Sequence, residues 1–378
     1  MSTPILGESL DQLRATRTSL KWRAFPPDVL PVWVAEMDAR PCEPVVEAVE
    51  TALRRGDTGY PWAEPLVAAF GDFAKRRWDW SPEPGTVVAD VMIGIEELLH
   101  VLTPPGGAVV LSPPCYDSFY GFVASVRRRT VLAPLGADHR LDATALDRAF
   151  ADAGPSSAYV LCNPQNPTGT VHTPEELATV ARLAERHGVT VVSDEIHAPL
   201  VQPGTTFTPY LSLPEAARGI AVVSASKAFN LAGLKAALVV PGPEAREAVG
   251  ELHEVVTHGA NHLGVIAQTA AYSRGEAWLD QLLGEIRDRR TLLATLLAEH
   301  LPGVVATPAE ATYLAWLDCS GLGLADPAGT FLARGRVCLS PGTSYDPDGV
   351  QWARFNLATS APVVAEAVRR MATACSPG

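Results

Sequence analysis

Lys227 stands where an amine can do covalent chemistry, because it follows a predicted buried strand at 220–224 within Ser224-Ala225-Ser226-Lys227. Open α/β sheets bind ligands at the carboxyl ends of their strands. A lysine at such an end can form an imine with an aldehyde and can then move a proton, provided that its surroundings favour the neutral amine. A surface lysine in a loop is the plainer interpretation of so short a motif.

Asp194 and Asn166 also follow predicted strands, at 189–193 and 158–162. An acid such as Asp194 can keep a pyridine-type ring nitrogen protonated, which makes the ring an electron acceptor, although an aspartate at a strand end can equally cap the next helix. Asn166 lies in a turn with two X-Pro units and a glycine, and this rigid turn can present the amide to a phenolate oxygen. Three such strand ends together indicate a binding cleft.

The segments that must position these residues alternate between strand and helix patterns. The strands are short, apolar and rich in valine, as expected for a largely parallel sheet with helices on both faces. We therefore predict an α/β fold with a mostly parallel sheet covered by helices, and a smaller α+β domain. The expected strands are 108–112, 158–162, 189–193, 220–224, 236–240, 313–317, 336–339 and 352–357, and the expected helices are 175–187, 243–256, 278–300 and 361–374.

A length of 378 residues suggests two unequal domains. Residues 1–45 are rich in proline and are expected to form an N-terminal arm and part of the small domain. Residues 46–275 are expected to form the large domain, and residues 276–378 the small C-terminal domain.

The composition narrows the class of protein. With 47% hydrophobic and 19% charged residues, the chain has an ordinary globular balance. A net charge of -12 argues against nucleic-acid and membrane partners, and no apolar run approaches the roughly 20 residues of a membrane span. The N-terminus lacks the layout of a secretory signal. The six cysteines lack metal-ligand spacing, so we expect reduced thiols, no metal and a cytoplasmic location.

Several motifs together resemble the fold type I pyridoxal-phosphate enzymes, and specifically the MalY/PatB-type cystathionine β-lyase (C–S lyase) group of the class I/II aminotransferase superfamily. The similarity runs through nearly the whole chain. Its markers are Val32-Trp33-Val34-Ala35-Glu36-Met37-Asp38, Gly59-Tyr60, Pro114-Cys115-Tyr116-Asp117-Ser118-Phe119-Tyr120, Asn166-Pro167-Thr168-Gly169, Ser193-Asp194-Glu195-Ile196-His197, the stretch 224–233 and Arg354-Phe355-Asn356-Leu357.

The resemblance implies roles for the residues around the cofactor ring. Pyridoxal 5'-phosphate is expected to form a Schiff base with Lys227 and to pair its ring nitrogen with Asp194. Asn166 and His197 are expected to contact the phenolate side, and Tyr116 to stack on the ring. Lys227, Tyr116 and Asp194 are thereby the expected catalytic residues.

The cofactor's phosphate has its own expected contacts. Ser224, Lys235 and the backbone amides of Val91 and Met92, at the start of a helix, fit this role. Tyr60 is expected to reach the phosphate of the neighbouring subunit, which implies a homodimer with shared sites. Asp90 places an acid at this loop where relatives often have a small residue, and an acid is unfavourable there unless it points away.

The resemblance also implies a substrate site. Arg354 is expected to hold the α-carboxylate of an amino acid with its planar guanidinium, whereas the sequence alone favours a surface salt bridge. Asn166, Trp33 and the backbone at Val34 and Ala35 are expected to line the same pocket.

The predicted reaction is β-elimination of L-cystathionine or another L-cysteine S-conjugate to pyruvate, ammonia and a thiol. The alternatives are an aminotransferase, or an enzyme for a specialised-metabolite S-conjugate on the same scaffold. His197 stands where many aminotransferases of this fold have tyrosine, which favours the lyase. A non-catalytic regulator is a further alternative, but the chain shows no segment that suggests a helix-turn-helix module.

Overall fold

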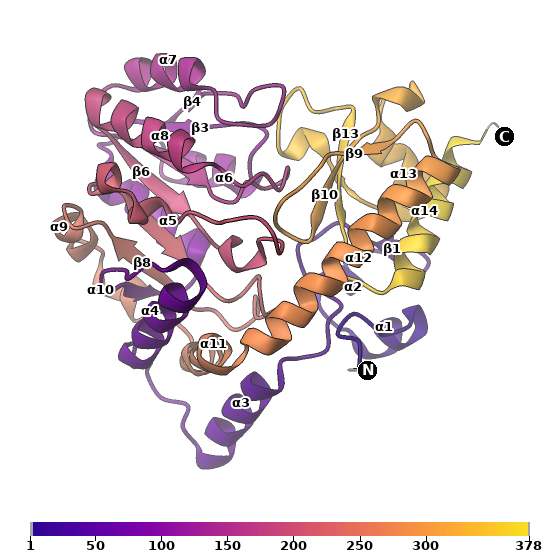
Figure 1. Cartoon of the computed structure of the whole chain (residues 1–378), viewed down its shortest axis with the longest axis horizontal. Coiled ribbons are helices and arrows are strands. Elements are labelled where there is room, and N and C mark those ends of the chain that lie inside the picture. The colour runs from indigo at the N-terminus through magenta and orange to yellow at the C-terminus, as the bar shows by residue number, and fades with distance from the viewer. Residues whose placement is uncertain (1–2, 377–378) are drawn as a thin grey trace. The chain divides into compact units, whose positions relative to one another are not determined.

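The computed structural model describes residues 3–376, which belong to two compact units (Figure 1). Unit 1 comprises Met1–Pro41, Asn166–Gly169 and Asp280–Gly378, and unit 2 comprises Cys42–Gln165 and Thr170–Leu279. The domain boundaries expected at 45/46 and 275/276 lie near the changes of unit after Pro41 and after Leu279. The placement of the turn Asn166–Gly169 in unit 1 is a difference from the expected division.

A seven-stranded sheet forms the centre of unit 2, in the order β2-β8-β7-β6-β5-β3-β4. The strands from β7 to β4 run parallel, whereas β8 is antiparallel to both β7 and β2. The predicted mostly parallel sheet is therefore confirmed. The strands are β2 (Thr86–Val88), β3 (Ala108–Leu111), β4 (Arg129–Leu132), β5 (Ser157–Cys162), β6 (Val189–Asp194), β7 (Ile220–Val223) and β8 (Ala237–Pro241).

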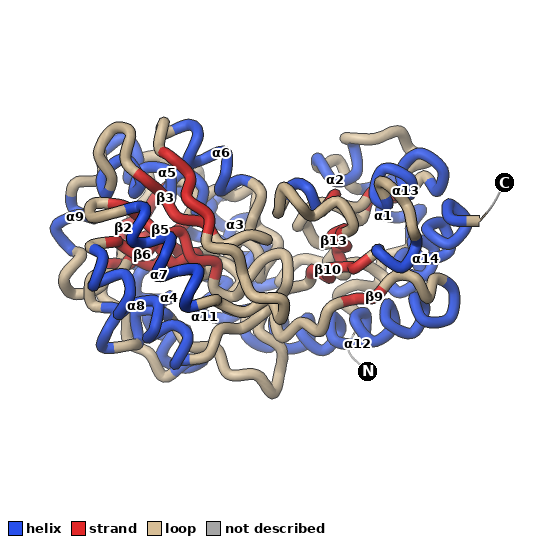
Figure 2. The backbone as a smooth tube through the Cα atoms, turned by 90° about the horizontal axis from the view of Figure 1, so that it is seen from above, coloured by secondary structure: helices blue, strands red, loops and turns tan. Residues whose placement is uncertain are grey.

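The two faces of this sheet bury separate apolar cores, because side chains alternate between the faces of a strand. From β5, Val160 joins the core that includes α5 (Val91–Leu102) and α6 (Ser118–Ser125). Its neighbour Leu161 joins the core that includes α7 (Ala143–Ala153) and α8 (Pro174–His187). Figure 2 shows helices on both sides of the strands of this unit. Covering both faces explains why the strands are apolar throughout.

Of the two helices predicted in unit 2, the one at 175–187 is confirmed as α8. Thr173 caps α8 in a capping box with Glu176, and Gly188, at a φ of 69°, ends it. The single helix expected at 243–256 is wrong: the segment forms two short helices, α9 (Arg246–Gly250) and α10 (Glu254–Thr257). The Nδ1 atom of His253 accepts from the backbone N of Val255 at 3.1 Å and so caps the second helix. The other helices are α3 (Glu43–Arg55), α4 (Glu64–Trp78) and α11 (His262–Arg274), with 3-10 turns η1 (Ala198–Leu200), η2 (Tyr210–Ser212) and η3 (Pro214–Ala216).

Unit 1 is built on a four-stranded antiparallel sheet in the order β12-β13-β10-β9 and a two-stranded parallel pair, β1-β11. Its core joins Leu293 and Leu297 of α12 to Phe331 of α13, Phe355 of β13 and Val364 of α14. The elements are α1 (Leu10–Thr16), α2 (Leu20–Arg23), β1 (Leu30–Pro31), α12 (Glu276–His300, whose first turn belongs to unit 2), β9 (Val305–Ala306), β10 (Leu314–Asp318), η4 (Ser320–Leu322), α13 (Pro327–Gly335), β11 (Val337–Cys338), β12 (Ser340–Pro341), η5 (Gly342–Ser344), β13 (Trp352–Asn356) and α14 (Ala361–Cys375).

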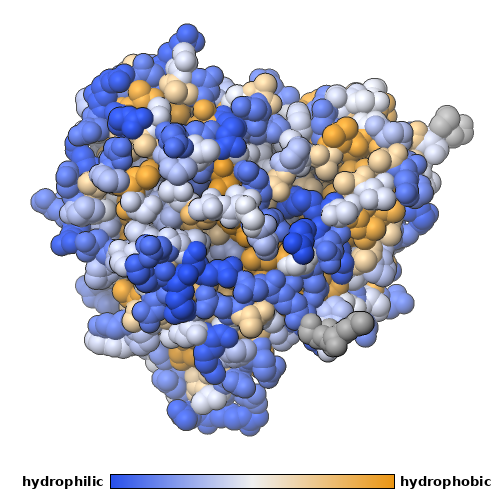
Figure 3. Space-filling model, viewed as in Figure 1, coloured by the Kyte–Doolittle hydropathy of each residue, from blue (hydrophilic) through white to orange (hydrophobic). Residues whose placement is uncertain are grey.

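The surface matches the ordinary balance of polar and apolar residues in the composition. The face shown in Figure 3 is mostly hydrophilic, with scattered hydrophobic residues, as is usual for globular proteins. Within residues 3–376, none of the helices has both the length and the apolar character needed to cross a membrane.

Candidate active site

The carboxyl ends of β5, β6 and β7 lie side by side in unit 2. In the parallel register Cys162 pairs with Asp194, and Asp194 pairs with Val222. Asp194 is therefore the last residue of β6, and the loop with Lys227 leaves the next strand at the same edge. The positive charge of Lys227 acts on Asp194 and opposes the rise in the pKa of its carboxyl group.

Asp194 is buried, with 4% of its surface exposed. The backbone N of Ile196 donates to its Oδ1 at 3.1 Å. Burial raises the pKa of Asp194 to about 7, while this hydrogen bond and the charge of Lys227 lower it. A buried carboxyl group with little compensation gains strongly from a cationic partner, so the site fits a ligand with a protonated ring nitrogen.

The loop with Lys227 is held in place by Gln268, a buried side chain of α11. Its Oε1 accepts from the backbone N of Ala225 at 3.0 Å, and its Nε2 donates to the carbonyl of Ala236 at 2.6 Å. Ser224 also donates to the Ala236 carbonyl, at 2.9 Å. The hydroxyl predicted to contact a phosphate is thus engaged inside unit 2. Gln268 was missed in the sequence, because a glutamine within a helix carries no local signal of this contact.

The start of α5 offers backbone amides to an anion. The first amides of a helix have no partner within it, and the helix dipole favours negative charge there. Asp90 caps the helix by accepting from the backbone N of Ile93 at 2.8 Å, so the amides of Val91 and Met92 are left at the open end. The other carboxylate oxygen of Asp90 pairs with Nζ of Lys235 at 2.5 Å. The acid in this loop is therefore oriented by the helix start and balanced by the lysine.

The remaining predicted cofactor contacts of unit 2 have different exposures. Tyr116 is half-buried, with its ring edge-on to Phe119 at 5.5 Å between centroids. His197 is buried directly before η1. Tyr60 lies in the loop between α3 and α4 and is 90% exposed.

Arg354 and Asn166 come together in unit 1. Arg354 is 4% exposed, and its Nη1 donates to Oδ1 of Asn166 at 3.1 Å. Its Nη2 donates to the carbonyl of Trp33 at 3.1 Å, and its guanidinium lies over the ring of Tyr345 at 4.7 Å. Among the described residues its Nε has no acceptor and no carboxylate pairs with it. A buried guanidinium without a carboxylate partner is better explained as a binding group for an acidic ligand than as half of a surface salt bridge.

The segment at Val34 and Ala35 is held through its backbone carbonyls, which accept hydrogen bonds from two side chains. Nδ2 of Asn356 donates to the carbonyls of Val34 and Glu36, at 2.7 and 2.6 Å. The hydroxyl of Tyr313 donates to the carbonyl of Ala35 at 3.0 Å. These bonds fix the segment against β13, the strand that carries Arg354. The sequence analysis did not predict this supporting role of Asn356, although the residue lies in the motif Arg354-Phe355-Asn356-Leu357.

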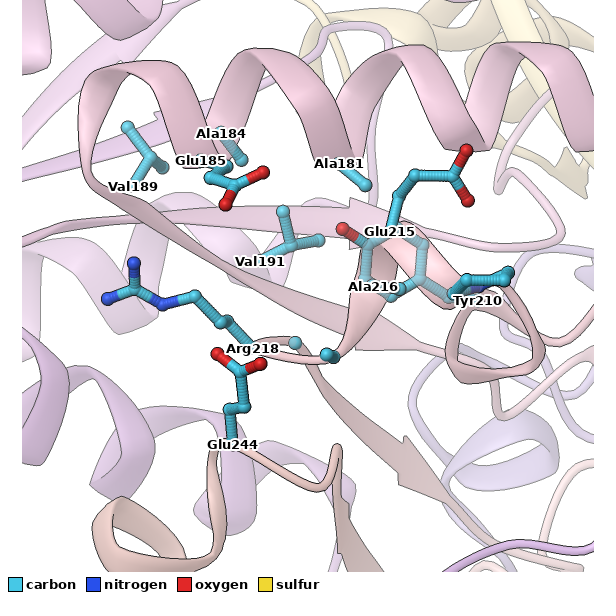
Figure 4. Close-up of a pocket in the computed structure, with 13 residues that line it drawn as sticks. Ala181, Ala184, Glu185, Val189, Val191, Tyr210, Glu215, Ala216, Arg218 and Glu244 are labelled. Carbon is cyan, nitrogen blue, oxygen red and sulfur yellow. The ribbon is translucent and has the colours of Figure 1, made fainter.

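A cavity elsewhere in unit 2 does not involve any predicted site residue. It has a volume of about 120 Å³ and lies along α8 and η3, with Tyr210, Glu215, Arg218 and Glu244 among its lining residues (Figure 4). Neither the strand-end residues of unit 2 nor Arg354 and Asn166 of unit 1 are among its lining residues.

Comparison with known proteins identifies the family. Residues 66–371 match the family model described as aminotransferase class I and II. The chain belongs to this family. The family predicted from the motifs is thereby confirmed, and Lys227, Asp194 and Arg354 are residues of a class I and II aminotransferase fold.

Similar members of the family are cystathionine β-lyases by name. A protein of Mycobacterium leprae named as such is 47% identical over 396 residues, which cover 99% of this chain and 98% of that protein. Cystathionine β-lyase PatB of Bacillus subtilis is 37% identical, with 92% of this chain and 93% of PatB covered. A structure from Corynebacterium diphtheriae, named as a PLP-dependent β-cystathionase, has a TM-score of 0.92 at 32% identity and covers 98% of this chain and 99% of its own.

Proposed function

We propose that this family member is a pyridoxal-phosphate-dependent C–S lyase. It cleaves L-cystathionine or another L-cysteine S-conjugate by β-elimination to pyruvate, ammonia and a thiol. The observation that carries the proposal is the buried carboxyl group of Asp194 within the field of Lys227 at adjacent strand ends. The reaction type is supported by relatives named as cystathionine β-lyases along nearly the whole chain.

The strand-end residues of unit 2 fit the cofactor. Bound pyridoxal phosphate supplies an electron sink that makes the Cα proton of an amino acid acidic. Asp194 would balance the charge on the ring nitrogen, and Lys227 would provide the amine that holds the cofactor at its aldehyde carbon. The NH2 group of Asn166 is the donor for the phenolate oxygen, since its Oδ1 accepts from Arg354. His197, Tyr116, Ser224, Lys235, the amides of Val91 and Met92, and Tyr60 of the partner subunit complete the proposed contacts.

Arg354 and Lys227 act on the substrate itself. The guanidinium of Arg354 binds the α-carboxylate and fixes the orientation of the Cα–H bond. Its position is set by Asn166 and the Trp33 carbonyl, and Val34 and Ala35 line the same pocket. Nζ of Lys227, displaced from the cofactor by the amino group of the substrate, would take the Cα proton, and the thiolate at Cβ would leave with the C–S bonding electrons as the Cα–Cβ double bond forms.

One assay separates this reaction from transamination, the alternative that the family's description suggests. Purified enzyme is given L-cystathionine without a keto acid, and pyruvate, ammonia and free thiol are measured. We expect equal amounts of the three products, and none with the Lys227→Ala variant. Amino-group exchange that requires a keto acid and leaves the C–S bond intact would replace the lyase by an aminotransferase.

We also propose a cytoplasmic homodimer. Tyr60 and Trp62 are 90% and 67% exposed in the loop between α3 and α4, and an exposed aromatic loop is typical of an interaction surface. None of the six cysteines, all of which lie among the described residues, forms a disulfide, as is usual in a reducing compartment. Fractionation of cells that express a tagged chain tests the location, and the shared site is tested at the scale of the whole molecule below.

A further inference from the structure

Glu195, the residue after Asp194, has an uneven set of hydrogen bonds. It is buried, with 1% of its surface exposed. The backbone N of Tyr210, Oγ of Ser193 and Nδ2 of Asn163 donate to one oxygen, Oε1, at 2.8, 3.0 and 3.2 Å. The second oxygen, Oε2, is buried and has no donor among the described residues. One oxygen is saturated, and the other has no partner.

Asn163, which directly follows β5, also has a side-chain oxygen without a donor. Its Nδ2 also donates to the carbonyl of Thr208 at 3.2 Å. Because a backbone carbonyl can only accept, the NH2 group must lie on this side, which fixes the orientation of the amide. Its Oδ1 is then left buried without a donor. Two side chains that are already joined each bury an oxygen that lacks a donor.

One proton satisfies both oxygens. We propose that Glu195 is a neutral carboxylic acid whose Oε2–H donates to Oδ1 of Asn163, and that this acid–amide pair is a positioning element that leaves the negative charge of the strand end on Asp194. The pair would have two parallel hydrogen bonds, one in each direction. It joins the end of β5 to the end of β6, where the backbone N of Asn163 also donates to the carbonyl of Asp194 at 2.9 Å.

The electrostatics of the surroundings agree with this assignment. The pKa of Glu195 is raised to about 7, mainly by burial, with a smaller contribution from the charge of Asp194 and with its hydrogen bonds opposing the rise. The phenol of Tyr210 is a further titratable group within the field of Glu195, and burial raises its pKa. Two adjacent buried carboxyl groups resist double ionisation. Lys227 acts on Asp194, so the first anion forms there and Glu195 keeps its proton.

Tyr210 takes part only through its backbone. Its side chain lines the cavity of Figure 4, while its amide donates to Glu195. The pair therefore links η2, β5 and β6 into one fixed end of the sheet. Its consequence for catalysis rests on the proposed function, because an ionised Glu195 would push the charge of Asp194 away from the position where a ring nitrogen needs it.

The proton can be observed without cofactor or substrate. We would label the chain with glutamate that carries ¹³C in its side-chain carboxyl group and record infrared spectra of the wild type and of Glu195→Gln. We expect a protonated-carboxyl band in the wild type below about pH 7 that Glu195→Gln removes. Glu176→Gln is the matched control, since its carboxylate pairs with Arg140 at 2.6 Å and should contribute no such band.

The pH dependence of unfolding of the cofactor-free chain gives a second test of whether Glu195 is protonated. The folded pKa of Glu195 lies above its ordinary value, so the folded state binds this proton more tightly. The wild type should therefore lose stability relative to Glu195→Gln as the pH rises from 4.5 to about 7. A constant difference between the two proteins over this range contradicts the proposal, as does the absence of the infrared band.

Activity of the loaded enzyme tests the positioning role. Gln keeps Oε1 as acceptor and places an N–H where the proposal puts O–H, so Glu195→Gln should keep kcat within about twofold. Glu195→Ala, which removes both hydrogen bonds, should lower kcat by about tenfold or more while KM changes little. If Glu195→Gln is as inactive as Glu195→Ala, Glu195 works as an anion and the proposal is wrong. If the wild type itself lacks lyase activity, the proposed function fails, and the infrared band and unfolding still decide the pair.

Discussion

The charged residues of the candidate site are buried, and the chain offers them few hydrogen bonds or opposite charges to offset the loss of water. Asp194 is buried with a backbone donor and a raised pKa, and Arg354 is buried with amide and carbonyl acceptors but no carboxylate among the described residues. Burying such groups costs stability. Groups of this kind cluster at functional sites because a ligand completes them. Their partners here would be a cationic ring and a substrate carboxylate.

Replacing Asp194 by Asn tests the first of these partners. The neutral amide cannot balance a positive ring nitrogen, so we expect kcat to fall by about 10²-fold or more. Above pH 7 the wild-type carboxyl is ionised and bears the cost of burial. The variant should therefore be at least as stable as the wild type at pH 8, measured by denaturant unfolding. Unchanged turnover would assign the ring nitrogen to another group.

Replacing Arg354 by Lys tests the second partner. Lysine keeps the charge but loses the planar fork that binds a carboxylate with two hydrogen bonds. The loss of about 1.5–3 kcal/mol from one charged hydrogen bond should lower kcat/KM for L-cystathionine about 10- to 150-fold.

A matched control separates substrate binding from folding. Arg290 is a half-buried arginine of unit 1, where its Nη2 donates to the carbonyl of Thr312 at 3.0 Å. Arg290→Lys should lower the free energy of unfolding and leave KM unchanged. Equal KM values for the Arg354→Lys variant and the wild type would remove Arg354 from the substrate site.

At the scale of elements, the sequence predicted those parts of the site whose signal is local. Lys227 and Asp194 follow apolar strands, so their common edge could be foreseen from the parallel register. Gln268 and Glu195 could not, because their contacts join segments that are distant in sequence. The prediction of one helix at 243–256 was wrong for a different reason. The apolar pattern continues past Gly250, but the cap at His253 starts a new helix.

The start of α5 gives a prediction at this scale. Asp90→Asn keeps the side-chain cap, since Asn and Asp are comparable N-caps, and removes a negative charge beside the proposed phosphate site. Lys235 is also released from its ion pair. We expect pyridoxal phosphate and inorganic phosphate to bind about two- to fivefold more tightly at low salt, as measured by calorimetry.

The control for Asp90→Asn is the same change at another cap. Asp142 caps α7 by accepting from the backbone N of Thr144 and Ala145 and is not a predicted site residue. Asp142→Asn should leave both affinities unchanged. Weaker binding by Asp90→Asn would mean that the ion pair with Asp90 is needed to position Lys235.

At the scale of the whole molecule, the proposed dimer predicts that variants with complementary defects restore each other. Tyr60 is 90% exposed, so Tyr60→Phe removes one hydroxyl without disturbing a core. Tyr60→Phe dimers lack the proposed partner contact at both sites, and Lys227→Ala dimers lack the amine at both. In a mixed dimer, however, the Tyr60→Phe subunit keeps Lys227 and receives Tyr60 from its partner.

Random reassociation at equal concentrations gives mixed dimers as half of the population, and one of their two sites is intact. Activity should therefore rise to about one quarter of the wild-type value per site, because half of the dimers each contribute half of their sites. Pyruvate release by the mixture, unfolded and refolded together, is compared with the sum of the two parents refolded separately. Activity equal to that sum would show that each subunit builds its phosphate site from its own residues, so that Tyr60 has no role across an interface.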